Sequence, residues 1–185
     1  MKRIFAVVLV LLLLSGCGFD NPGLDRVMAL RAKLLASSCS FDAVITADYG
    51  DKIYSFTLAC QGDSSGNMQF EVKQPESIAG ITGVIRNDGG FLTFDNAALA
   101  FELLADDQFS PVSSPWILLR TLRGGYVTAC GENETGLQLS IDDSYEEDAL
   151  HLQIQLSSAD IPAFAEILYN GRRIIAMQVE NFQIL

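Results

Sequence analysis

The sequence predicts a mostly β protein of the α+β class, an antiparallel meander with two helices. Three observations lead to this prediction. Apolar and polar residues alternate in short runs over most of the chain, turn-forming residues separate the runs, and only two stretches have helical periodicity. No internal repeat, low-complexity segment or linker interrupts residues 20–185, so we expect them to form one domain.

The first sixteen residues are expected to be an export signal rather than part of this domain. Lys2 and Arg3 precede eleven consecutive apolar residues, 4–14. As a helix this run would be roughly 16 Å long, about half of a ~30 Å hydrocarbon core, which suits a signal peptide and is too short to span a membrane. The run continues into Leu14-Ser15-Gly16-Cys17, which resembles the bacterial lipobox. This resemblance implies cleavage before Cys17, a diacylglyceryl thioether on that residue and an acylated new amino terminus.

We therefore predict a lipoprotein signal peptide over residues 1–16 and a lipidated tether over 17–19. Two or more acyl chains anchor a protein stably, whereas one holds it only marginally. The protein is then expected at the cell membrane, facing the extracytoplasmic side. The alternative is an ordinary signal peptide that is cut elsewhere and leaves Cys17 as a free thiol.

The chain is strongly acidic once the signal is removed. It has 12 basic and 23 acidic residues, and removal of Lys2 and Arg3 leaves 10 against 23, a net charge of −13. Such a surface repels nucleic acid and anionic headgroups, so the lipid rather than charge must hold the protein at the membrane. Its 49% apolar content argues against disorder.

The first helix is expected to begin at Asn21-Pro22, because asparagine caps helices and proline suits their first position. Its apolar residues fall on one predicted stripe: Leu24, Val27, Met28, Leu34 and Leu35. We expect this stripe to pack on the domain core. A helix that lies on the lipid surface is the less favoured alternative, because its polar face carries few cations.

The next two runs, 39–49 and 53–60, predict a hairpin and a disulfide that depends on its register. If the loop has four residues, opposing residue numbers sum to 99 and Cys39 faces Cys60, within reach of a disulfide. A two-residue loop shifts the sum to 101 and separates them. A disulfide between Cys130 and one of these two is the competing prediction.

The remaining elements follow from the same patterns. The second helix is expected over 114–123, started by Ser114-Pro115 and closed by Gly124. Asn170-Gly171 predicts a type I′ hairpin, with a helix over 162–169 as the alternative. Further strands are expected at 68–72, 78–86, 91–95, 97–104, 126–131, 137–141 and 150–156.

The order of these elements resembles the lipoprotein-carrier (Lol-type) superfamily. The matching stretches are FEVKQPESIAGI at 70–81, GGFLTFD at 89–95, SPWILLRTL at 114–122 and AEILYNGRRIIAMQVENFQI at 165–184. The closer likeness is to the small Gram-positive membrane lipoproteins of that superfamily, including the spore-germination lipoproteins. The resemblance rests on pattern and order, and it implies a strongly curved antiparallel sheet, a half-open β-barrel, with the N-terminal helix and the short second helix packed on its concave side.

The resemblance also implies a binding function without catalysis. Carriers of this superfamily hold acyl chains in the cavity, whereas the germination lipoproteins bind and support a cell-wall enzyme. A lipid on Cys17 would prevent the diffusion that a shuttling carrier needs, so we predict a membrane-anchored module that holds or stabilises a protein partner such as a cell-wall hydrolase. Acyl-chain binding in the concavity is the alternative. Candidates to line the cavity, or else to pack in the core, are Phe91, Phe94, Phe101, Leu103 and Trp116.

Two stretches suggest other chemistry. GDSSG at 62–66 resembles a protease nucleophile loop, but its flanks do not match, and a triad needs a base within hydrogen-bond reach. We expect a turn there, and a solvated strand residue at His151, the only histidine. DDSYEED at 142–148 lacks the glycine typical of calcium loops, so we expect a solvated loop. We predict no enzyme, cofactor or metal site.

Overall fold

The computed structural model describes residues 21–94, 97–101, 104–105 and 108–185, of which those from 94 to 109 are described by their backbone alone. The elements in chain order are α2 (Pro22–Ala36), β1 (Cys39–Asp48), β2 (Ile53–Gly62), β3 (Met68–Gln74), η1 (Glu76–Ile78), β4 (Thr82–Arg86), β5 (Gly89–Phe94), β6 (Ala97–Phe101), β7 (Leu104–Ala105), β8 (Gln108–Phe109), η2 (Pro111–Ser113), α3 (Ser114–Gly124), β9 (Tyr126–Asn133), β10 (Gly136–Asp142), β11 (His151–Leu156), β12 (Pro162–Tyr169) and β13 (Arg172–Ile184).

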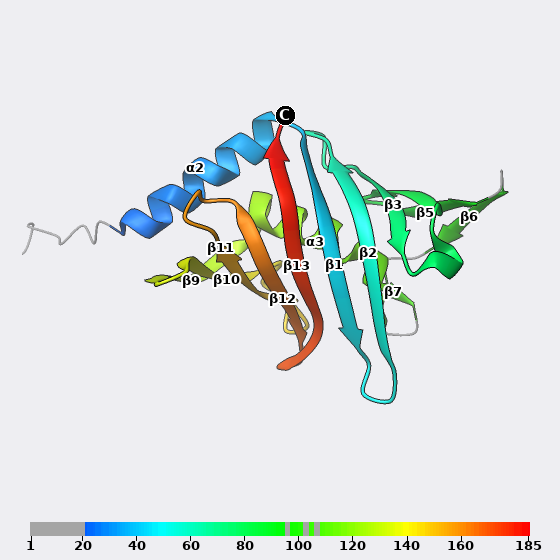
Figure 1. Ribbon diagram of the computed structural model, residues 1–185. Helices are drawn as coiled ribbons and strands as arrows, with labels where there is room; N and C mark the ends of the chain where they lie inside the picture. Colours follow the sequence, from blue (N-terminus) through cyan, green and yellow to red (C-terminus); the bar gives the residue numbers. More distant parts are fainter. Residues whose placement is uncertain (1–20, 95–96, 102–103, 106–107) are drawn as a thin grey trace, which may run out of the picture.

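Eleven of these strands form one antiparallel sheet, in the order β6-β5-β4-β3-β2-β1-β13-β12-β11-β10-β9. Each half of the sheet is a meander of neighbours in the chain, and the first strand pairs with the last, with Ala43 opposite Val179. In Figure 1 the long strands β13, β1 and β2 lie in front, the strands toward either edge recede, and α3 lies behind the sheet. The sheet is therefore curved and unclosed, as the sequence predicts.

The core fills the inner side of this curve. One set of alternating strand residues is buried there, for example Phe41, Ala43 and Ile45 of β1. Helix α3 contributes five further buried apolar side chains, those of Trp116, Ile117, Leu118, Leu119 and Leu122. Gly62 of β2 allows the close approach of this helix, because a Cβ atom there would lie 2.6 Å from Leu119 Cδ1.

The N-terminal helix begins as predicted but faces the core differently. Asn21 Oδ1 accepts hydrogen bonds from the amides of Gly23 and Leu24, at 3.1 and 3.2 Å, and Pro22 is the first helical residue. The buried residues of α2 are Val27, Leu30 and Leu34. The predicted stripe is therefore wrong for three of its five residues: Leu24, Met28 and Leu35 are 39%, 49% and 53% exposed.

The register of the first hairpin separates the two cysteines of the predicted disulfide. Tyr49 N donates to Lys52 O at 3.0 Å, which leaves Gly50 and Asp51 as a two-residue loop. Residue numbers across β1 and β2 therefore sum to 101, so that Cys39 lies opposite Gly62. Cys39, Cys60 and Cys130 are all free thiols in the structure, and the predicted disulfides are wrong.

Most other elements lie where the patterns place them. Asn170 and Gly171 have φ of 49° and 74° and join β12 to β13, so the hairpin is confirmed and the alternative helix is wrong. Residues 78–81 differ from the prediction, because η1 follows Pro75 and β4 begins only at Thr82. Among the described helices, none has the length and apolar character needed to cross a membrane.

Candidate functional site

The inner, concave face of the sheet is occupied by the protein's own helix. Eight of the eleven residues of α3 are buried. Trp116 is 3% exposed, and its Nε1 donates to Gly66 O in the β2–β3 turn at 2.8 Å. The hollow beside this helix has a volume of about 170 Å³. Ligand pockets usually measure about 300–1,000 Å³, so this hollow is small for a bound lipid.

The small hollow combines apolar walls with two arginines. Leu35, Trp116 and Leu119 are among its lining residues, together with Arg120 and Arg123. The Arg120 guanidinium lies 5.2 Å from the centre of the Trp116 ring. Arg123 Nη2 is buried and, among the described residues, has no hydrogen-bond partner. An oxygen atom attached to a short apolar group would match this arrangement.

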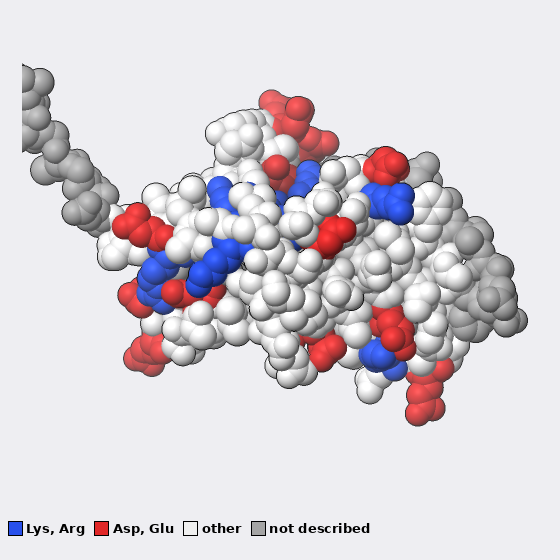
Figure 2. Space-filling model, turned by 90° about the horizontal axis from the view of Figure 1, so that it is seen from above, with Lys and Arg blue, Asp and Glu red and all other residues white. Residues whose placement is uncertain are grey.

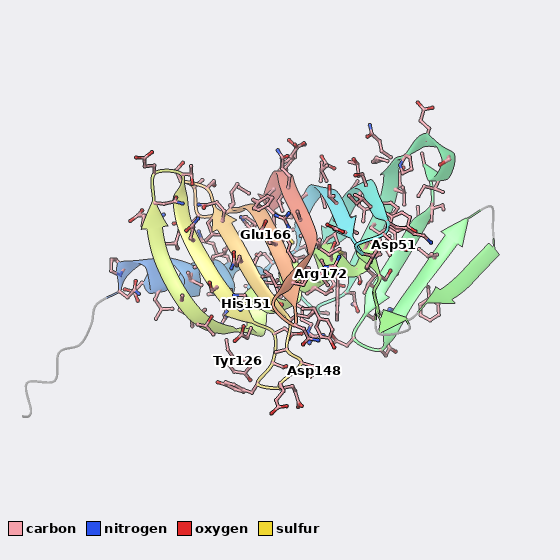
Figure 3. All side chains as sticks on the ribbon, turned by 90° about the horizontal axis from the view of Figure 1, so that it is seen from below. Asp51, Tyr126, Asp148, His151, Glu166 and Arg172 are labelled. Carbon is pink, nitrogen blue, oxygen red and sulfur yellow. The ribbon has the colours of Figure 1, made fainter. Side chains whose placement is uncertain are left out.

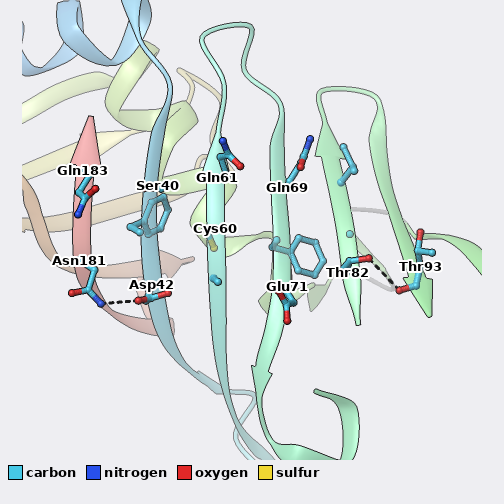
Figure 4. A pocket seen from close by; sticks show the side chains of 15 residues that line it. Ser40, Asp42, Cys60, Gln61, Gln69, Glu71, Thr82, Thr93, Asn181 and Gln183 are labelled. Carbon is cyan, nitrogen blue, oxygen red and sulfur yellow. Dashed lines mark hydrogen bonds between the residues drawn. The ribbon is translucent and has the colours of Figure 1, made fainter. Parts of the chain in front are cut away.

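A larger hollow lies on the opposite, outer face of the sheet. It is an open groove of about 670 Å³ that crosses β13, β1, β2, β3, β4 and β5 (Figure 4). Nine of its fifteen lining residues have amide, hydroxyl or carboxylate side chains: Ser40, Asp42, Gln61, Gln69, Glu71, Thr82, Thr93, Asn181 and Gln183. The other six are apolar or glycine: Phe41, Ala59, Cys60, Phe70, Gly83 and Val84. Its volume is within the range of ligand pockets.

A β-bulge shapes one end of this outer groove. The pairing of β1 with β13 shifts between Ser40 and Asp42, and Asn181 has φ of 54°, a conformation that asparagine tolerates better than most residues. Asn181 Nδ2 donates to Asp42 Oδ2 at 2.7 Å. The bulge thus directs a coupled amide and carboxylate into the groove (Figure 4).

The chemistry of the outer groove suits a polar ligand or surface. Amide side chains both donate and accept hydrogen bonds, and hydroxyls do the same. Two carboxylates, Asp42 and Glu71, give the groove negative charge, although Lys73 Nζ lies 2.8 Å from Glu71 Oε1. Exposed peptide backbone and basic side chains on a partner would both find matching groups here.

The predicted cavity residues do not form one site. Phe91 is 47% exposed and lies opposite Val84, which lines the outer groove, whereas Trp116 is buried on the inner side. The structure therefore places these two residues on opposite faces of the sheet and does not bring them into one cavity. Phe94 and Phe101 belong to β5 and β6, but their side chains lie outside the described residues. Leu103 and Cys17 lie outside them altogether.

The protease-like stretch forms a turn that is distant from the histidine. Asp63 N donates to Asn67 O at 3.0 Å, which closes the turn between β2 and β3. His151 lies on β11 and its Nδ1 is 2.6 Å from Asp142 Oδ1. Three strands separate β2 from β11, about 19 Å at the usual strand spacing.

Residues 143–150, which hold most of the acidic stretch, form the loop between β10 and β11. Figure 3 shows His151 and Asp148 near the same end of the sheet as Tyr126. Within the described residues, no three histidine, cysteine, aspartate or glutamate side chains are arranged to hold a metal ion.

Comparison with known proteins gives similarity of fold alone. No protein-family model matches the sequence, and no curated protein matches it. An uncharacterized conserved protein of Thermus thermophilus is 12% identical, with 88% of this chain and 87% of that chain covered and a TM-score of 0.49. A LolA-superfamily protein of Nitrosomonas europaea is 7% identical, with 86% and 93% covered and a TM-score of 0.46.

A third similar structure is a chain of the MucA/MucB complex of Pseudomonas aeruginosa. It is 13% identical, with 86% of this chain and 57% of that chain covered and a TM-score of 0.41. At these identities and TM-scores, membership of the Lol-type superfamily stays a prediction from the sequence.

Proposed function

We propose that this protein is a membrane-anchored, non-catalytic binding module that holds a protein partner outside the cytoplasm. The lipid on Cys17 would provide the anchor, and the folded domain would provide the binding surface. The resemblance to spore-germination lipoproteins makes a cell-wall hydrolase one candidate partner within this proposal. If the module binds the folded form of its partner and not the unfolded form, this binding would stabilise the folded partner by mass action.

The observation that carries the proposal is the contrast between the two faces of the sheet. α3 buries eight residues on the inner face and leaves a hollow of about 170 Å³, whereas the outer face has a groove of about 670 Å³. A polar groove on a rigid sheet suits a protein surface or an extended polypeptide, because amide side chains can bond to peptide groups. An acyl chain would instead require apolar walls.

A site-specific crosslinking experiment tests the proposal. A photoreactive phenylalanine analogue replaces Gln61 in the outer groove or, as a control, Lys52, an exposed residue of the β1–β2 loop. Crosslinking in intact cells is expected to join one protein to position 61 and none to position 52. Equal crosslinking at both positions, or none at either, would contradict the proposed site.

Acyl-chain binding remains the second candidate function, on one specific observation. The small hollow has apolar walls and a buried Arg123 Nη2 without a partner among the described residues, which suits a carboxyl or ester oxygen. Native mass spectrometry of the domain, purified without detergent, separates the two functions. A co-purified lipid would favour this second function, and a bare domain would favour the protein partner.

A further inference from the structure

The outward side of α2 is unusually apolar for a solvent-facing helix. Its exposed residues are Pro22, Leu24, Asp25, Met28, Ala29, Ala32, Lys33, Leu35 and Ala36, so only two of them are charged. Leu24, Met28 and Leu35 are four and seven positions apart, a spacing that aligns them in one row along the helix. This row lies beside the buried stripe but is not part of it.

The two arginines of α2 do not cover its apolar row, because both bond to other parts of the domain. Arg26 bonds to Asp160 and Glu132, with Nε at 2.9 Å from Asp160 Oδ1. Arg31 donates to the backbone oxygens of Leu122 and Gly125, both at 2.8 Å. Both arginines therefore turn toward the domain and leave the apolar row uncovered. Figure 2 shows this side of the molecule, with extensive uncharged surface between separate acidic and basic groups.

The position of α2 in the chain limits what can cover this row. Five residue steps separate Cys17 from Pro22, the first residue of α2, and they span at most about 18 Å when fully extended. If Cys17 carries the lipid, the helix must begin close to the headgroup layer. α2 itself is about 22 Å long, so its whole length would reach the bilayer if its axis ran parallel to the membrane.

We propose that α2 lies flat on the membrane and inserts Leu24, Met28 and Leu35 into the interface between headgroups and acyl chains. Such helices bury their apolar side about 5–10 Å into this boundary. Lys33 lies about 140–180° around the helix from this row, so its charged end would point away from the bilayer into water. The helix would thus orient the domain as well as tether it. This inference rests on the proposed lipidation of Cys17.

Tryptophan quenching in vesicles tests the orientation. Met28→Trp places the probe in the row, and Ile53→Trp is the control, because Ile53 is 68% exposed beside the β1–β2 hairpin, at the far end of the sheet from α2 (Figure 1). The acylated proteins are reconstituted in phosphatidylcholine vesicles that contain brominated lipid. The wild type, whose Trp116 is buried, supplies the background.

The fraction of tryptophan fluorescence that the bromolipid quenches is expected to be at least about twofold larger for the probe at position 28 than for the probe at position 53. This difference is expected because only the probe at position 28 would be buried at the membrane interface. Leu35→Glu in the Met28→Trp chain is expected to reduce this difference, whereas a loose tether would be insensitive to it. A probe at position 28 that acrylamide reaches and bromolipid does not would overturn the inference. Shielding from both quenchers would overturn it too, since it would mean that protein covers the row.

The mass of the purified protein distinguishes a wrong orientation of α2 from the absence of lipidation. If the protein carries acyl chains and floats with the vesicles but the probe at position 28 is unquenched, the orientation is wrong and lipidation stands. If it carries no acyl mass, lipidation and this inference are both wrong.

Discussion

Arg31 and Arg123 each bond to the other's helix near its carboxyl end. Arg31 of α2 donates from Nε and Nη2 to Leu122 O and Gly125 O at the end of α3, and Arg123 of α3 donates from Nε to Leu34 O at the end of α2. Cations at these ends also interact favourably with the helix dipoles. The two helices therefore satisfy each other's terminal carbonyl groups, which fixes their crossing on the sheet.

We expect Arg31→Ala to lower the free energy of unfolding by about 1.5–3 kcal/mol, because hydrogen bonds to a charged donor are lost and two carbonyl groups lose their partner. The measurement is urea unfolding followed by circular dichroism. Lys33→Ala, on the exposed side of the same helix, is the control and should change stability by no more than about 0.5 kcal/mol. Equal effects of the two substitutions would show that the arginine contacts are not specific.

The contact between Gly62 and α3 predicts a steric effect. Gly62→Ala would bring a Cβ within 2.6 Å of Leu119 Cδ1, and Leu119 is fully buried and cannot move away freely. We expect a loss of about 1–3 kcal/mol in unfolding free energy. Gly124→Ala is the control, because nothing lies within 4 Å of its Cβ position. A Gly62→Ala protein as stable as the wild type would mean that α3 does not pack closely against β2 at this position.

The thiols of the folded domain should react slowly. Burial raises the pKa of the Cys60 thiol, and the charge of Asp42 raises it further; burial also raises the pKa of Cys39 and of Cys130. Since the thiolate is the reactive form, we expect Ellman's reagent to modify Cys60 and Cys39 at least about tenfold more slowly in the native Cys17→Ser protein than in the urea-unfolded chain. Unfolding should release three thiols. A count of one would indicate a disulfide.

Asp63 predicts a pH-dependent contribution to stability. Partial burial by itself would raise the pKa of Asp63. The Asp63 carboxylate accepts hydrogen bonds from Asn67 N and Nδ2, both at 2.9 Å, and these bonds lower the pKa. With smaller contributions from Ser65 and Arg123, they outweigh the effect of burial. A carboxylate with a lowered folded-state pKa stabilises the protein above its unfolded pKa of about 4, and the stabilisation is lost as pH falls through the folded value.

Asp63→Ala should therefore cost about 1 kcal/mol of unfolding free energy near pH 7 and clearly less near pH 2. Urea unfolding at the two pH values measures the difference. Asp51→Ala, in the exposed β1–β2 loop, serves as the control and should have little effect at either pH. A pH-independent cost for Asp63→Ala would contradict the assigned role of its charge.

Cys17→Ser should release the protein from membranes, because the acyl chains would have no attachment point. The expected result is transfer from the membrane pellet to the soluble extracytoplasmic fraction, with an unchanged circular dichroism spectrum. Cys130→Ser should leave the protein in the pellet and is the matched control. A Cys17→Ser protein that stays with the membranes would refute the lipid anchor.

Elements that depend on local chemistry could be predicted from the sequence. Asn21-Pro22 fixes the start of α2 through a cap within three residues, and Asn170-Gly171 fixes a hairpin through the φ values that these two residues adopt readily. The strands follow from their alternation. These signals need no information from distant parts of the chain, which explains their success.

Features that depend on register or on long-range pairing could not be predicted. The stretch that contains Gly50 permits a two- or a four-residue loop, and this choice decides whether Cys39 faces Cys60 or Gly62. The outer groove needs the contact of Asp42 with Asn181, 139 positions later. Its polar residues look like an ordinary solvated strand face in the sequence. Periodicity likewise placed Leu24 and Val27 on one stripe, although only contact with the domain shows which of two adjacent sides is buried.

The pairing of β1 with β13 sets the order in which the domain can be completed. Each meander can form from hairpins as its residues become available, but the central seam joins Cys39 to Ile184 and must wait for the final strand. Contacts this distant in sequence slow folding. Loss of the last thirteen strand residues, Arg172–Ile184, would leave two half-sheets, each with a newly unpaired central edge. A nascent chain stalled before β13 would therefore expose both unpaired edges and be prone to aggregation.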